Sequence, residues 1–126
     1  MFHRLVVTVV LLFALVGCTT IESTTGVPRI YQAAIADTVS TSIALNQGAR
    51  ELNPLGFAGA SIGKLVYLYI RSDLTQEEQS RYDRLATSLW TGAAASNTLQ
   101  LLVPGSGLLL GLGVGIYVGI SIYQGW

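Results

Sequence analysis

The chain has 126 residues, of which 51% are hydrophobic and only 11% are charged, so it forms one domain at most. Its formal net charge is zero and it has no basic tract, which argues against nucleic acid as a partner. Charged residues usually make up about a quarter of a soluble domain, and here none follows Arg84. This composition predicts lipid rather than water around the second half of the chain.

The N-terminus has the features of a secretory signal. Arg4 gives it a positive start, and the apolar stretch that follows, about a dozen residues, is too short to span hydrocarbon comfortably. It ends in Leu15-Val16-Gly17-Cys18, which resembles the lipobox of bacterial lipoproteins. The resemblance implies cleavage between Gly17 and Cys18 and acylation of the Cys18 thiol, which then becomes the new N-terminus.

We therefore expect a signal peptide over residues 1–17 and a lipidated, Ser/Thr-rich tether over residues 18–29. Two or three acyl chains anchor a protein firmly, whereas a single chain binds membranes only marginally. Cys18 is the only cysteine, so an intramolecular disulfide is excluded. The alternative interpretation is a buried cysteine in an uncleaved membrane helix. No cofactor is expected apart from the lipid on Cys18.

The remainder, residues 30–126, predicts an all-α fold: a small membrane-embedded bundle of three to four helices. Apolar residues at helical spacing and the breaks between them place these helices at about residues 30–47, 55–71, 76–103 and 107–124.

Three local signals set the helix ends. Gly48 is expected to end the first helix, and Asn53 before Pro54 predicts a turn after it. Thr75 with Glu78 three residues later fits a capping box, which predicts a helix start at that point.

The last segment carries a glycine at every fourth position: Gly107, Gly111, Gly115 and Gly119. Helices in a membrane associate by close backbone approach, which small residues permit. Each helical glycine costs about 1 kcal/mol relative to alanine, so four at one spacing favour a packing surface over a loose tail. Self-association and packing within the chain both remain possible. The candidate partner surfaces are Gly59 with Gly63 and the stretch from Gly92 to Ser96.

No catalytic or metal site is evident. The stretch "GASIG" around Ser61 matches the nucleophile elbow of hydrolases, but that site needs a histidine downstream. The only histidine, His3, lies in the segment expected to be removed. We therefore predict a protein that is not an enzyme, with no metal and no evident soluble substrate.

Asp37 and Lys64 form a candidate polar membrane site, together with Thr41, Glu51 and Asn53. An ionisable side chain inside a membrane costs roughly 2.5–3.5 kcal/mol on insertion scales, so it tends to find a partner. An antiparallel pairing of the first two helices leaves Asp37 and Lys64 about one and a half turns out of register. Lysine reach can narrow that gap, with Glu51 as a competing partner; otherwise Lys64 snorkels and Asp37 faces water.

Residues 31–103 resemble a family of small multi-pass bacterial membrane proteins of unknown function. The resemblance rests on two motifs, Asp37-Thr38-x-Ser40-Thr41 and Gly48-x-x-Glu51-x-Asn53-Pro54, and on Asn97 as the polar position of the third helix. It implies a shared polar site without naming an activity. Proteins of that family usually lack a lipobox.

The membrane topology has more than one solution. With Cys18 outside the cytoplasm, four spanning helices place Arg71, Arg81 and Arg84 outside as well, against the positive-inside rule. The first helix can instead lie along the outer interface while the other three span. Alternatively, no helix spans and an oligomer packs against the leaflet. Thr19 after the cysteine resembles lipoproteins that are sorted to the outer membrane.

Two functions follow as hypotheses. The first is a lipid-anchored bacterial envelope protein that acts as a non-enzymatic structural or interaction component, with membrane lipid and a second copy or an envelope protein as partners. The second is a small channel or transporter subunit with a polar path near Asp37, Glu51, Asn53 and Lys64. The expected location is the inner membrane if the helices span, and the outer membrane otherwise.

Overall fold

The computed structural model describes residues 27–48, 56–103 and 107–126. All the secondary-structure elements of this part of the chain are helices, which confirms the predicted all-α class. Its elements are α3 (Arg29–Asn46), α4 (Gly56–Ile70), the 3₁₀ turn η1 (Arg71–Asp73), α5 (Gln76–Leu102) and α6 (Gly107–Gln124). The lipobox residues Gly17 and Cys18 and the candidate site residues Glu51 and Asn53 lie outside the described residues.

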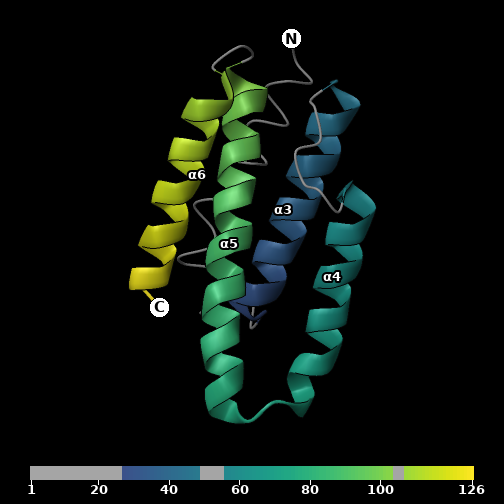
Figure 1. Ribbon diagram of the computed structural model, residues 1–126, viewed down its shortest axis with the longest axis vertical. Coiled ribbons are helices and arrows are strands. Elements are labelled where there is room, and N and C mark those ends of the chain that lie inside the picture. Colours follow the sequence, from purple (N-terminus) through teal and green to yellow (C-terminus); the bar gives the residue numbers. More distant parts are fainter. Residues whose placement is uncertain (1–26, 49–55, 104–106) are drawn as a thin grey trace.

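The four helices lie side by side, and successive helices run in opposite directions (Figure 1). α5 is the central element, because it packs lengthwise against both α3 and α6. α4 meets α3 over a much shorter stretch and is the least attached helix. An α3 that lies along the outer interface while the other helices span the membrane would lie apart from them. In the structure α3 instead packs along α5.

The helix ends follow the local sequence signals. α3 ends at Asn46 with Gln47 as its C-cap, and Gly48 after it has a φ of +87°, a left-handed conformation that L side chains rarely adopt. α5 begins at the predicted capping box: the Glu78 N–H donates to the Thr75 hydroxyl at 3.4 Å, and the Thr75 N–H donates to the Glu78 carboxylate at 3.0 Å. These bonds satisfy backbone groups that a helix start would otherwise leave unpaired.

The capping box gives a first prediction. Thr75→Ala is expected to lower the free energy of unfolding by about 1 kcal/mol, the usual cost of losing such a cap. The Thr75 hydroxyl and N–H lower the pKa of Glu78 below its ordinary value of 4.5. The contribution of Glu78 is therefore complete above pH 4.5 and disappears as the pH falls through the lowered pKa.

Urea unfolding from pH 3 to 7 checks both effects. Glu78→Gln is expected to make the free energy of unfolding less dependent on pH in the acidic part of this range. Glu77→Gln, one residue away in the same turn, is expected to leave that pH dependence unchanged. An unchanged profile in Glu78→Gln would contradict the assignment.

Burial in this bundle is inverted relative to a water-soluble protein. Among the described residues, the buried apolar side chains are those of Ile30 and five alanines, while nine buried residues are polar or charged. Large apolar side chains lie on the outside instead: Leu109 is 85% exposed, Tyr69 81% and Tyr117 74%. A buried polar group and an exposed apolar patch are the two informative departures from ordinary burial, and both occur here.

Among the described residues, no helix combines the length and the apolar composition needed to cross a membrane. The prediction of membrane-embedded helices therefore gains no support from helix length and hydropathy.

Candidate functional site

The most concentrated chemistry in the bundle is a cluster of polar side chains where α3, α4 and α5 meet. α3 contributes Asp37, Thr38 and Thr41, α4 contributes Lys64, and α5 contributes Asn97. On α3, Thr41 lies four residues after Asp37 and three after Thr38, so it neighbours both on the helix surface. We call these five residues the polar cluster.

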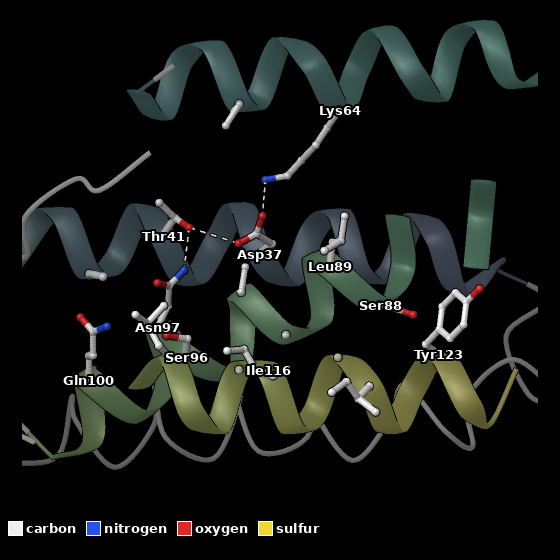
Figure 2. Close-up of a pocket in the computed structure, with 18 of the residues that line it drawn as sticks. Asp37, Thr41, Lys64, Ser88, Leu89, Ser96, Asn97, Gln100, Ile116 and Tyr123 are labelled. Atoms are coloured by element: carbon white, nitrogen blue, oxygen red, sulfur yellow. Dashed lines mark hydrogen bonds and ion pairs between the residues drawn. The ribbon is translucent and has the colours of Figure 1, made fainter. Parts of the chain in front are cut away.

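Lys64 and Asp37 form the centre of the polar cluster. The Lys64 Nζ lies 2.6 Å from the Asp37 Oδ2, and the two side chains are only 8% and 10% exposed. Lys64 also donates to the Thr38 hydroxyl at 3.3 Å. It is the one buried residue of α4, and Figure 2 shows its side chain reaching from that helix to the Asp37 carboxylate on α3.

A relay of hydrogen bonds extends from Asp37 to α5. The Asn97 Nδ2 donates to the Thr41 hydroxyl at 2.8 Å, and that hydroxyl donates to the Asp37 Oδ1 at 3.3 Å (Figure 2). The Asn97 amide also reaches the Ser40 hydroxyl at 3.4 Å. A buried charge is stable only with a counterion and hydrogen bonds. The Asp37 carboxylate receives these from Lys64 and from Thr41, and Thr41 in turn bonds to Asn97, so three helices are joined through this one carboxylate.

The structure brings together three of the five residues expected at this site: Asp37, Thr41 and Lys64. The register difference between Asp37 and Lys64 is bridged by the length of the lysine side chain, one of the two alternatives that the sequence left open. Thr38, Ser40 and Asn97 were not predicted as site residues. The family motif on α3 and α5 contains all three, so the signal for them was present.

A cavity of about 620 Å³ adjoins the polar cluster, and all four helices line it. Asp37, Thr41, Lys64 and Asn97 are part of its wall, with Ser96 and Gln100 beside them. Most of the other lining residues are apolar or glycine, among them Leu89, Ile116 and Ile120, but the wall also includes Ser88, Tyr123 and Gln124. Its size falls within the range of small-molecule sites, which are mostly apolar with a few placed polar groups.

A second polar network ties α4 to α5 near the turn between them. The Asp83 carboxylate is paired with the Arg71 guanidinium through two hydrogen bonds, and it accepts a third from the Tyr67 hydroxyl at 2.7 Å. The Arg71 guanidinium also lies over the Tyr31 ring of α3, 5.5 Å from its centroid. Sequence reasoning missed this network.

The sequence positions of Tyr67 and Asp83 could have revealed this second polar network. Each lies eight residues from Thr75, and residues equidistant from the turn of an antiparallel pair meet.

Tyr67→Phe removes one hydrogen bond to the Asp83 carboxylate and keeps the ring that packs edge-on against Trp90. Because Arg71 still pairs with Asp83, we expect a loss of only about 1–2 kcal/mol in the free energy of unfolding. Tyr69→Phe is the matched control, since that side chain is 81% exposed, and it should change stability little. An equal loss in both variants would contradict the role of the hydroxyl.

The glycine series of α6 lies against α5. A Cβ on Gly115 would come within 2.7 Å of the Gly92 carbonyl oxygen, and one on Gly119 within 3.1 Å of the Ser88 carbonyl oxygen. A Cβ on Gly111 would meet the Ser96 hydroxyl and the Gln100 amide at 3.0–3.2 Å. These three glycines therefore pack within the chain, on the α5 surface around Gly92 and Ser96. Gly107 is the first residue of α6.

Within the described residues, no group of three or more His, Cys, Asp or Glu side chains is placed to hold a metal ion. The arrangement instead offers one buried ion pair, a relay of neutral hydrogen-bonding groups and an adjoining apolar cavity. Comparisons of the chain with protein-family models, with curated proteins and with solved structures find no match.

Proposed function

We propose that this chain is a lipid-anchored bacterial envelope protein that acts as a non-enzymatic structural or interaction component, with its apolar outer surface against lipid acyl chains. The observation that carries this proposal is the inverted burial: small and polar side chains pack inside, and large aliphatic and aromatic ones lie outside. In water this surface would be an aggregation liability, whereas in lipid it has no hydrophobic cost.

The internal packing supports the same environment. The α5–α6 contact is made by glycines and serines, and three helices are joined by polar side chains. Small residues at helix contacts and hydrogen bonds between helices are the two devices that join helices in lipid. The lipobox at Cys18 supplies the tether. The proposal requires contact with lipid, and it does not require that any helix crosses the membrane.

Cysteine labelling in membranes tests the lipid contact. Maleimides react with the thiolate, which forms in water and not in hydrocarbon. Tyr117→Cys replaces a side chain of α6 that is 74% exposed, and Glu77→Cys is the control on the exposed first turn of α5. In membrane fragments open on both sides, we expect Glu77→Cys to react with an impermeant maleimide. Tyr117→Cys should react only after SDS dissolves the membrane, and equally fast reaction of the two thiols beforehand would refute the lipid contact.

Mass spectrometry of the mature N-terminus and membrane fractionation test the tether. The expected product begins at Cys18 and carries added acyl mass, and Cys18→Ser is expected to retain the signal. The same fractionation assigns the protein to the inner or the outer membrane. An unprocessed N-terminus without acyl mass would contradict the tether and leave the lipid-contact test unaffected.

The cavity beside the polar cluster favours a second candidate, a small channel or transporter subunit. Its wall contains Asp37 and Lys64, two of the four residues expected to lie near a polar path. Ion flux in liposomes should then fall in Asp37→Asn and in Lys64→Leu. No flux in the parent protein, or unchanged flux in both variants, would exclude this function.

A further inference from the structure

We propose that the cavity between the four helices binds a single-chain lipid with an uncharged, hydrogen-bonding head group, such as a monoacylglycerol. This proposal rests on the proposed function in one respect: contact with a membrane would give the cavity access to such a lipid. The binding site itself is argued from the cavity wall.

The amides of Asn97 and Gln100 lie together at one end of the cavity wall. Figure 2 shows them with Ser96 toward that end, and Leu89, Ser88 and Tyr123 toward the other. Along α5, the lining residues Asn97 and Leu85 are twelve positions apart, or about 18 Å. One leaflet of a bilayer provides about 15 Å of hydrocarbon, so one acyl chain fits the apolar part of this length.

The charge of the wall selects the head group. Among the described residues, Asp37 and Lys64 are the only charged groups that line the cavity, and they neutralise each other at 2.6 Å. A fatty acid would place its carboxylate beside Asp37, and a cationic amphiphile would compete with Lys64 for the same carboxylate. Either would disturb a buried ion pair, which is strongly unfavourable. An uncharged head group leaves the pair intact.

The polar end also has hydrogen-bonding capacity to spare. The Asn97 amide nitrogen donates to Thr41 and Ser40, but its carbonyl oxygen accepts no hydrogen bond from any described residue. The Gln100 amide lines the cavity and makes none within the described part of the chain. A glycerol head group carries hydroxyls that both donate and accept, so it can satisfy these amides together.

The cavity is open along its apolar part. Leu89 and Ile116, which face it from α5 and α6, are 61% and 62% exposed. By contrast, the lining residues Asp37, Lys64 and Ser96 are buried. An acyl chain along α5 and α6 would cover this exposed apolar surface, which is the main favourable term expected for such a ligand.

Photolabelling of the full chain in detergent tests the proposal. The probe is a monoacylglycerol with a diazirine in the middle of its acyl chain, and peptide mapping locates the label. We expect saturable labelling of the lining segments of α5 and α6. Ile116→Trp, which fills the apolar part, should weaken binding about tenfold, while Leu109→Trp, which does not line the cavity and is 85% exposed, should leave it within roughly twofold.

The head group is tested separately with Gln100→Leu. This variant should lose the preference for monoacylglycerol over the methyl ester of the same acyl chain, while its circular dichroism and elution volume stay unchanged. Equal labelling of Ile116→Trp and Leu109→Trp, or labelling that does not saturate, would overturn the site.

Two other outcomes identify a different occupant and equally overturn the proposal. Labelling that appears only in Cys18→Ser would mean that the chain's own acyl group fills the cavity. Crosslinks from the cavity to a second copy, formed by an added chemical crosslinker in the absence of the lipid probe, would mean that a helix of the partner fills it. The photolabelling is done in detergent, so a negative maleimide result in membranes would refute the lipid contact without affecting the lipid-binding cavity. Likewise, a negative photolabelling result would refute the cavity site without affecting the lipid contact.

Discussion

Lys64→Leu is expected to lower the free energy of unfolding by about 3–5 kcal/mol, the largest effect of any single substitution proposed for this chain. The variant leaves the Asp37 carboxylate buried on α3 with only the Thr41 hydroxyl to stabilise its charge. Asp37 cannot escape to water, because it lies on the inner face of a helix that packs along α5. α4 loses its only buried side chain at the same time, so this helix should detach first.

The opposite substitution should cost less. In Asp37→Leu the lysine keeps its charge, but it sits on α4, whose other side chains are not buried, and its long stem can carry the ammonium outward. The double variant Asp37→Leu/Lys64→Leu should recover most of the loss, since replacing a whole buried ion pair by apolar residues is often neutral. Denaturant titrations of the three variants and the parent, followed by circular dichroism, make the comparison. A double variant as unstable as Lys64→Leu would show that the loss comes from packing rather than from charge.

Gly115→Ala is expected to be the second most damaging change, with a cost of about 1–3 kcal/mol. The added methyl would lie 2.7 Å from the Gly92 carbonyl oxygen and 3.0 Å from the Ser96 Cβ. The Gly92 carbonyl is part of the α5 backbone and cannot rotate away from the added methyl, so the two helices must separate. Gly92→Ala, whose Cβ would come within 2.5 Å of the Gly115 carbonyl oxygen, should have a similar effect from the other helix.

Gly113→Ala is the matched control for this prediction. It lies two residues away on α6, and its Cβ would meet nothing within 4 Å. Alanine is favoured over glycine in a helix by about 1 kcal/mol, so this variant should be as stable as the parent or more stable. Thermal unfolding therefore tests a difference in sign between two identical substitutions. Equal destabilisation by both would mean that the α5–α6 contact does not decide the effect, because helix propensity alone favours alanine at both positions.

Much of the local structure was predictable because it depends on neighbours in the sequence. The helix bounds differ from the predicted ranges by one residue at most, apart from the 3₁₀ turn that replaces the end of the second helix. The Thr75–Glu78 capping box and the left-handed Gly48 are decided within four residues of chain. The four-residue spacing of glycines on α6 likewise indicated a packing surface before its partner was known.

The partners of these surfaces depend on tertiary structure. The sequence left open whether the α6 glycines pack within the chain or against another copy, and the close approach of α5 decides it for Gly111, Gly115 and Gly119. Similarly, Lys64 had Asp37 and Glu51 as alternative partners. The axial offset of α3 and α4 places Lys64 within reach of Asp37, and no short-range pattern encodes that offset.

The sequence by itself determined the all-helical class, the helix ends and the presence of a few costly polar groups among apolar ones. Those features arise from backbone propensity, capping and periodicity, which act over one or two turns. Only the tertiary structure decided that Asp37, Lys64 and Asn97 share one network, that Asp83 is buried, and that an amphipathic cavity lies beside them. Each depends on how far helices approach and slide past one another, and that is set by packing of the whole bundle.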